Sequence, residues 1–222
     1  MTITASNLGK RFNREWIFSG LTSTFYSGNI YAITGPNGSG KSTLMQVLWG
    51  QVPPSEGTIS YELNGRLIPE DEAYKQVSIA TPYMDLIEEF TLQEQIDFHF
   101  RFKKPQPGLS VKVMTEKLQL ESSVHKPIRQ FSSGMKQRLK LGLAMFSSSE
   151  ALFLDEPTTN LDSPSTQWYM SNLMEFSANR LVFIATNQTS DYPEGTPTIN
   201  LSGLKRGKQP DGLVTNMFQT SI

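Results

Sequence analysis

The sequence predicts an α/β protein with a mostly parallel sheet, an antiparallel sheet at its edge and an inserted helical segment. Two observations support this fold class. First, short apolar runs separated by helical patterns predict buried strands of a parallel sheet, and they lie at 29–35, 76–82, 151–157 and 181–187. Second, the early segments 2–8 and 21–28 alternate polar and apolar residues, which is typical of antiparallel strands.

The first strand–turn–helix unit is predicted at 29–50. The run "NIYAITG" is a strand that ends at Gly35, and "KSTLMQVLWG" is a helix closed by Gly50. The following stretch, "GTISYELNGR", is predicted to be a strand and a tight turn, because Asn64-Gly65 is a strong turn signal.

The segment 82–143 changes character and predicts a helical insert. Helical patterns occupy 91–102 and 110–120, and "KKPQPG" separates them. Later, 163–178 predicts a helix with Ser163 as its N-cap and Pro164 at the first helical position.

We therefore expect a single domain over 1–222. Its core would comprise 1–81 and 144–201, its insert 82–143, and 202–222 would be a polar C-terminal tail.

Composition excludes several classes of function. The net charge of −1 gives no bulk attraction for nucleic acid, so no direct nucleic-acid partner is expected. The absence of cysteine excludes disulfides, cysteine-ligated zinc and thiol catalysis. The first residues, "MTITASNLGKRF", have no apolar signal core, and no apolar run approaches the roughly 20 residues that cross a bilayer. A role at a membrane would therefore require a partner.

The strongest motif is "GPNGSGKST", which matches G-x-x-x-x-G-K-[ST] between a predicted strand and a predicted helix. Its glycines allow backbone N–H groups to point at phosphate oxygens, and the helix N-terminus adds partial positive charge. Lys41 supplies a cation for the β- and γ-phosphates, and the Ser42 hydroxyl is a ligand for Mg²⁺. The motif predicts a P-loop NTPase core that binds ATP and Mg²⁺ through Gly35, Pro36, Asn37, Gly38, Ser39, Gly40, Lys41, Ser42 and Thr43.

A second chemical segment is "ALFLDEP". Its apolar strand delivers Asp155 and Glu156 at the carboxyl end, where ligands of open α/β sheets bind. We expect Asp155 to hold Mg²⁺ and Glu156 to act as the general base for the attacking water. Lys41 completes the expected catalytic set on the phosphate side.

A second helix start also has the features of an anion site. In "FSSGMKQRLKLGLAM" (131–145), Ser132, Ser133 and Gly134 precede a basic, apolar-periodic helix. Such a start presents hydroxyls and free N–H groups to an anion. The alternative is a plain capped amphipathic helix.

Taken together, "GPNGSGKST", "FSSGMKQRLKLGLAM" and "LFLDEPTTNLD" resemble the nucleotide-binding domain of ABC ATPases, from about residue 2 to 201. The resemblance implies a head-to-tail dimer around two ATP molecules. Ser132, Ser133, Gly134 and Asp162 would then contact the nucleotide held by the partner subunit. The alternative for Asp162 is a residue near a helix cap.

The resemblance also implies that Phe12 stacks on adenine, with Trp16 the less suited substitute. The alternative for both is packing in the edge sheet.

The sequence departs from the family pattern at three places. In the signature, Phe131, Ser133 and Met135 replace the usual leucine, first glycine and glutamine. Pro82 stands where the family has a glutamine near the metal, and proline lacks both a polar side chain and an N–H. Asn187 replaces the histidine that contacts the γ-phosphate; it can donate a hydrogen bond but cannot take a proton. We expect hydrolysis to persist but to be slow. The two histidines, His99 and His125, are expected at the surface or in packing.

The resemblance implies an ATP-binding and ATP-hydrolysing subunit that powers an ABC transporter through dimer closure. Its expected partners are an integral membrane permease and a second ABC ATPase domain, and its expected location is the cytoplasmic face of a membrane. Two alternatives remain: an ABC ATPase that acts outside transport, and a slow ATP-dependent clamp or degenerate half-site in a heterodimer. The transported substrate and the direction of transport leave no mark on the sequence.

Overall fold

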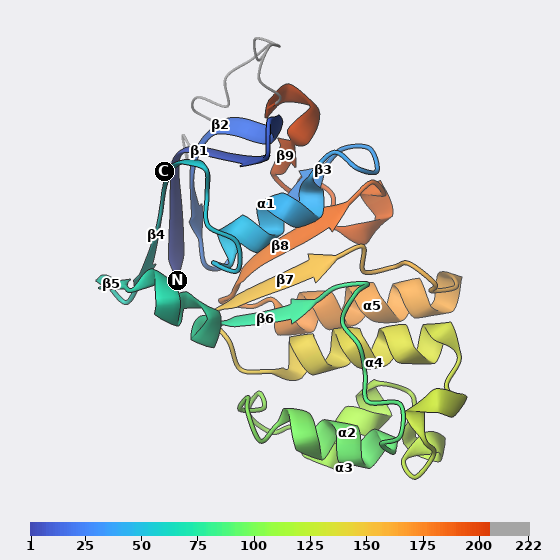
Figure 1. The fold of residues 1–222 in the computed structure, drawn as a ribbon. Helices are drawn as coiled ribbons and strands as arrows, with labels where there is room; N and C mark the ends of the chain where they lie inside the picture. The colour runs from blue at the N-terminus through green and yellow to red at the C-terminus, as the bar shows by residue number, and fades with distance from the viewer. Residues whose placement is uncertain (205–222) are drawn as a thin grey trace.

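The computed structural model describes residues 1–204 as two β-sheets and a helical layer (Figure 1). The strands are β1 (Thr2–Phe12), β2 (Glu15–Tyr26), β3 (Ile30–Thr34), β4 (Glu56–Leu63), β5 (Arg66–Ile68), β6 (Val77–Ala80), β7 (Ala151–Asp155), β8 (Leu181–Thr186) and β9 (Thr198–Asn200). The helices are α1 (Lys41–Leu48), α2 (Leu92–His99), α3 (Val111–Lys117), α4 (Ser133–Phe146) and α5 (Ser163–Phe176). The described residues also form five short 3₁₀ segments, η1 (Glu70–Gln76), η2 (Glu121–Ser123), η3 (Ile128–Gln130), η4 (Thr189–Asp191) and η5 (Leu201–Leu204).

The main sheet is parallel, with the strand order β6-β7-β8-β3-β9. Its central strands are buried on both faces, which is why they appear in the sequence as continuous apolar runs. One face packs against α1 and the antiparallel sheet, and the other packs against α4 and α5 (Figure 1). The predicted α/β class is confirmed.

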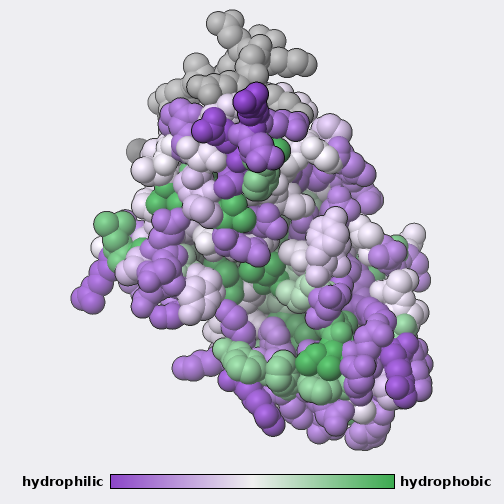
Figure 2. All heavy atoms as spheres, viewed as in Figure 1, coloured by the Kyte–Doolittle hydropathy of each residue, from purple (hydrophilic) through white to green (hydrophobic). Residues whose placement is uncertain are grey.

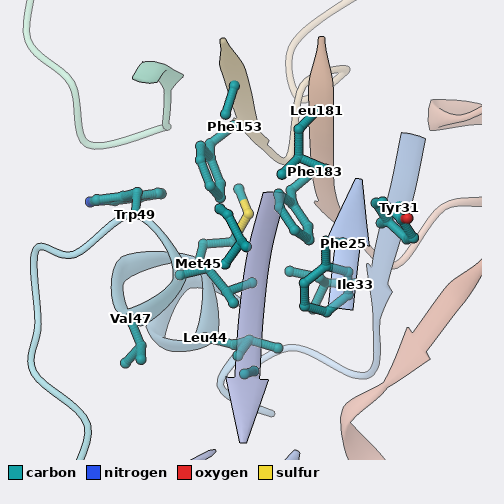
Figure 3. Packing of buried hydrophobic residues seen from close by; sticks show 14 of the residues in the cluster. Phe25, Tyr31, Ile33, Leu44, Met45, Val47, Trp49, Phe153, Leu181 and Phe183 are labelled. Atoms are coloured by element: carbon teal, nitrogen blue, oxygen red, sulfur yellow. The ribbon is translucent and has the colours of Figure 1, made fainter. Parts of the chain in front are cut away.

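The hydrophobic core between the parallel sheet, α1 and the antiparallel sheet fixes the position of α1. Figure 3 shows Leu44 and Met45 of α1 on the side of Phe153 and Phe183, which come from neighbouring strands of the sheet. The Phe153 and Phe183 rings are stacked with centroids 5.0 Å apart, and Trp49 meets Phe153 edge-on at 5.3 Å. Because Trp49 directly follows α1, its close packing on Phe153 limits how far α1 can shift relative to β7.

The antiparallel sheet has the order β2-β1-β4-β5. Both segments predicted to alternate lie in it, since 2–8 belongs to β1 and 21–26 to β2. Asn64 and Gly65 join β4 to β5 with φ angles of 50° and 76°, so the predicted tight turn is also confirmed. Positive φ at both central residues matches the twist of a hairpin.

Helices α2, α3 and α4 lie between β6 and β7 in the chain and form the helical layer. Thr91 caps α2 in a capping box with Glu94, and Ser132 caps α4. Helix α4 continues to Phe146, so residue 143, where the sequence predicted the end of the insert, falls inside it. Figure 2 shows hydrophobic side chains gathered on one face of this lower part of the molecule, among hydrophilic neighbours.

One local prediction requires correction, and one element was not predicted. The N-cap of α5 is Asp162, whose carboxylate accepts a hydrogen bond from the Ser165 N–H at 2.9 Å; Ser163 is the first helical residue and Pro164 the second. Strand β9, which pairs with β3, was not predicted. Of the predicted polar tail, 202–204 lie in η5 and 205–222 fall outside the described residues. Within residues 1–204, no helix is both long and apolar enough to cross a membrane.

Candidate functional site

The glycine-rich loop connects β3 to α1 at the carboxyl edge of the parallel sheet. Gly40 immediately precedes α1 with φ 101°, and a Cβ there would meet the Ile17 side chain at 2.2 Å. Gly35 has φ 147°, and a Cβ there would meet the Ser39 hydroxyl at 2.7 Å. Both positions therefore require glycine, and the backbone can curve closely enough to present its N–H groups to an anion.

Lys41 lies at the centre of this loop. Its side chain is buried, and its Nζ donates to the carbonyl oxygens of Gly35 at 3.0 Å and Pro36 at 3.3 Å. The buried Ser39 hydroxyl has no hydrogen-bond partner among the described residues. Buried polar groups are normally satisfied, so an unsatisfied hydroxyl beside a held cation fits a site that receives a phosphate.

Asp155 ends β7 with only 3% of its surface exposed. Burial raises the pKa of its carboxyl group and the neighbouring Glu156 charge adds to the rise, while the Ser42 hydroxyl and Lys41 oppose it. Its Oδ1 has no hydrogen-bond partner within the described chain.

The donor set around Asp155 fits Mg²⁺. The cation prefers oxygen ligands, and it usually takes only one or two from protein when a nucleotide supplies phosphate oxygens. Asp155 and Ser42 supply such oxygens here. Over residues 1–204, no group of three or more His, Cys, Asp or Glu side chains is placed to hold a metal ion.

Glu156 directly follows the end of β7 and is held in an uncommon backbone conformation. Its φ is 46°, in the left-handed region, and its N–H donates to the Ala185 carbonyl at 2.8 Å. The Thr159 hydroxyl lies 3.4 Å from one carboxylate oxygen. Non-glycine residues at positive φ are held there by their surroundings, so the direction of the Glu156 side chain is determined by this turn.

Asn187 follows β8 and reaches across to the glycine-rich loop. Its side-chain amide donates to the Asn37 side-chain carbonyl at 3.2 Å. The strand order places β8 between β7 and β3, so the ends of these strands bring Asn187, Asp155 and Lys41 to one edge of the sheet.

The start of α4 is exposed instead. The side chains of Ser132 and Ser133 are at the surface, and Ser132 Oγ accepts from the Met135 N–H at 3.2 Å. A Cβ on Gly134 would lie 3.3 Å from the Asn160 carbonyl, and the Gln137 amide donates to the Pro157 carbonyl at 2.9 Å. The helix start therefore packs against the loop that follows Glu156 in the same chain.

The β1–β2 hairpin borders the glycine-rich loop through Ile17. Phe12, at the end of β1, is 49% exposed, and the Lys10 ammonium lies 5.1 Å from its ring centroid. Trp16, on β2, has Arg11 5.6 Å from its ring centroid. Asp162 caps α5, as one of the two sequence alternatives proposed.

Pro82 lies just beyond β6, and its carbonyl accepts a hydrogen bond from Lys140 of α4 at 3.0 Å. Sequence reasoning missed Lys140, and it also missed Asp191, which joins the loop after β7 to the end of β8. Lys140 is one of several basic residues in a helical pattern, and Asp191 lies in a stretch without periodicity, so no local pattern identifies either residue.

A groove of about 460 Å³ opens where the core meets the helical layer, and its lining includes Trp49, Ser78, Met84, His99 and Lys103. The Ser78 hydroxyl is buried and has no hydrogen-bond partner among the described residues. Burial lowers the pKa of His99 to about 4, the nearby Lys103 charge adds to this effect, and the Leu143 carbonyl opposes it. At neutral pH His99 is therefore uncharged, and burial also lowers the pKa of the Lys103 ammonium.

Residues 18–159 match the family model described as ABC transporter. Over 193 residues the chain is 31% identical to the Nod factor export ATP-binding protein I of Burkholderia lata, which covers 85% of this chain and 63% of that protein. Over 186 residues it is 31% identical to the lantibiotic transport ATP-binding protein SrtF of Streptococcus pyogenes, covering 82% and 77%. The chain thus spans less than two thirds of the length of the first relative.

Solved structures agree in fold. A bacterial Atm1-family ABC exporter with ATP bound superposes with a TM-score of 0.76 at 20% identity, over 93% of this chain and 38% of that one. A dimeric bacterial ABC transporter cassette gives 0.73 at 22% identity, over 92% and 97%. The family model and the sequence relatives, together with a fold built around this glycine-rich loop, show that the chain belongs to the ABC transporter family.

Proposed function

We propose that this chain binds and hydrolyses ATP as the nucleotide-binding subunit of an ABC transporter. The observation that carries the proposal is the convergence of Lys41, Asp155, Glu156 and Asn187 at one edge of the parallel sheet. The Ser42 hydroxyl and the Lys41 charge both lower the pKa of Asp155, and Asn187 donates a hydrogen bond to Asn37 of the glycine-rich loop. The relatives named for export and transport support the same function.

In this proposal the loop 35–43 binds the phosphates of ATP through its N–H groups. Lys41 exchanges its two carbonyl partners for the β- and γ-phosphates. Ser42 and Asp155 would hold Mg²⁺, which would supply positive charge to the phosphate oxygens. Phe12, exposed on the neighbouring hairpin, stacks on the adenine ring.

Glu156 accepts a proton from the water that attacks the γ-phosphorus. The bond between that phosphorus and the oxygen bridging it to the β-phosphate breaks, giving ADP and inorganic phosphate. Asn187 donates a hydrogen bond to the γ-phosphate but takes no proton. Hydrolysis is therefore slow, and we attribute this to Asn187 and Pro82.

Two copies associate head to tail in this proposal. Ser132, Ser133 and Gly134 of one copy cap the γ-phosphate held by the other, and Asp162 lies at the same interface. The exposure of the α4 start supports this, because a helix N-terminus at the surface is available to an anion on a second molecule. One of the similar structures is a dimeric cassette, which supports the association of two copies.

The transmembrane partner is an integral membrane permease, and the chain works at the cytoplasmic face. The groove at Trp49, Met84 and Lys103 is the surface that we assign to the permease. Its apolar lining, the Lys103 charge and the unpartnered Ser78 hydroxyl suit an apolar segment that carries one acidic or carbonyl group. An ATP-dependent clamp is the second candidate, favoured by Asn187 and Pro82.

The test compares phosphate release by the purified wild-type chain and by Glu156→Gln, with Mg²⁺ and ATP. We expect measurable wild-type turnover that falls at least about 100-fold in the variant, while ATP affinity changes little. Glu175→Gln, exposed on α5, is the matched control and should equal the wild type.

Equal turnover in wild type and Glu156→Gln would show that Glu156 is not the base. ATP binding without any wild-type turnover would favour the clamp.

A further inference from the structure

Asp191 is a buried carboxylate near the candidate hydrolytic residues. It ends the 3₁₀ segment η4 (Thr189–Asp191), and only 1% of its surface is exposed. Taking a carboxylate out of water is unfavourable unless its oxygens accept strong hydrogen bonds. Its partners therefore indicate what this burial maintains.

Each carboxylate oxygen of Asp191 accepts a hydrogen bond from a different segment of the chain. Thr158, in the loop after β7, donates its hydroxyl to Oδ1 at 2.6 Å. Thr186, the last residue of β8, donates to Oδ2 at 2.5 Å. Both threonines are buried, and hydrogen bonds to a carboxylate are stronger than those between neutral groups. One side chain thus joins the two segments that leave neighbouring strands.

The two segments carry the residues assigned to hydrolysis. Thr158 follows Glu156 by two positions, and the turn between them is closed by the Thr159 N–H on the Glu156 carbonyl at 3.2 Å. On the other side, the Thr186 hydroxyl also accepts from the Gln188 N–H at 2.9 Å, so a bond spans Asn187. A shift of either threonine would move Glu156 or Asn187.

Asp191 itself is anchored from a third element. The Tyr169 hydroxyl of α5, fully buried, donates to the Asp191 carbonyl at 2.9 Å. Because this hydrogen bond fixes the backbone of Asp191, the carboxylate can set the distance between the loop after β7 and the end of β8. A purely packing role would be served as well by apolar side chains of similar volume.

We propose that Asp191 is a positioning residue for hydrolysis. Through its hydrogen bonds to Thr158 and Thr186, it fixes the positions of Glu156 and Asn187 relative to each other. The inference rests on the proposed ATPase function. Asp191 makes no contact with ATP in this proposal, so its loss should lower the rate of the chemical step and leave the affinity for ATP unchanged. Misplacement of a catalytic group by about 1 Å can lower a rate by on the order of 100-fold.

The experiment measures turnover and, separately, ATP affinity for Asp191→Asn, Thr158→Val, Thr158→Ser and Thr186→Val. Asp191→Asn keeps the shape but loses the charge, and we expect kcat to fall about tenfold with the ATP Kd within about twofold of wild type. The two valine variants should lose turnover similarly, whereas Thr158→Ser, which keeps the hydroxyl, should stay within about twofold. Combining Thr158→Val with Asp191→Asn should cost little more than either alone.

Ser147→Ala is the control for lost stability. Its hydroxyl is also fully buried and donates to the Leu143 carbonyl at 2.7 Å, but it lies at the end of α4. All variants are assayed at a temperature where circular dichroism shows them folded. We expect Ser147→Ala to melt earlier and to keep the wild-type kcat.

Wild-type kcat in folded Asp191→Asn and Thr158→Val would overturn the inference, as would equal losses in Thr158→Ser and Thr158→Val. If wild-type turnover depends on Glu156 while Asp191→Asn has no effect, only the positioning role fails. If the wild type shows no turnover, the proposed function and the positioning role fail together.

Discussion

The two helix starts that could bind an anion differ in how much of a site each one provides. At α1, the glycine-rich loop surrounds a buried lysine, and the cap is Gly40, which makes no side-chain cap bond. At α4, two serines lie at the surface, and the Ser132 hydroxyl is already used by the helix. The first start has charge, curvature and unsatisfied donors, and the second has N–H groups and hydroxyls alone.

The difference indicates that α1 can bind a nucleotide by itself and that α4 can only add to one already bound. A helix N-terminus contributes partial charge over its first turn, which is weak next to a full ammonium charge. In the proposed dimer, α1 therefore determines affinity and α4 determines closure. Two experiments separate these two contributions, and a third tests the far end of α4; they follow from the largest expected effect to the smallest.

Lys41→Met tests whether the N-terminus of α1 binds the nucleotide by itself. We expect ATP affinity to fall about 100-fold, equivalent to about 2.7 kcal/mol, because the variant loses the only full charge of the loop while keeping the apolar stem. Titration calorimetry measures the affinity. Lys75→Met, an exposed lysine paired with Glu72, is the control and should bind as the wild type does. Unchanged affinity in Lys41→Met would remove the distinction between the two starts.

Ser133→Asp tests whether the N-terminus of α4 contacts a nucleotide that is bound to a second copy. An acidic residue in the first turn favours the helix, so the chain should stay folded, but its charge repels a phosphate on a second copy. We expect turnover to fall about tenfold while ATP affinity of the single chain is unchanged, and ATP-induced dimers in a Glu156→Gln background to be lost on gel filtration. Gln93→Asp in the first turn of α2 is the control. Normal dimers in Ser133→Asp would mean that the α4 start lies outside the interface.

The far end of α4 lies beside a titratable side chain, His99, and pH tests this contact. Ser147, after α4, lies 2.9 Å from His99 Nε2, whose pKa is about 4, below the value of about 6.5 in an unfolded chain. Because the folded pKa is depressed, His99 favours the folded state fully above about pH 6.5, and this contribution is lost as the pH falls toward 4.

Between about pH 7 and about pH 5.5, the free energy of unfolding of wild type should fall about 1 kcal/mol more than that of His99→Gln. Urea denaturation at the two pH values measures this difference. His125→Gln, exposed, is the control and should keep the wild-type pH dependence. Identical pH dependence in His99→Gln would show that His99 is protonated without penalty in the folded chain.

The sequence predicted the elements whose residues are chosen by burial. β3, β7 and β8 are apolar because both faces of the parallel sheet are covered, and that signal is local. The glycine-rich loop was predictable for a related reason, since its spacing is set by the backbone geometry that a phosphate requires.

The rest depended on choices that a local pattern does not determine. Asp162 and Ser163 are both good caps, and only the backbone angles of the folded chain select Asp162. Strand β9 has three residues, and it is ordered by pairing with Ala32–Thr34, far away in the sequence. The bonds of Asp191 likewise join three separate segments, so they exist only after the sheet has formed.

Strand β9 also limits how the chain can be cut. It covers the open side of β3, the strand that leads into the glycine-rich loop, and Leu201 just beyond it is fully buried, 3.7 Å from where a Cβ on Gly35 would lie. A fragment that ended before Thr198 would leave β3 as an unprotected edge and remove the side chain beneath the first glycine of the loop. The surroundings of the loop therefore include a segment far along the chain, in addition to its own strand and helix.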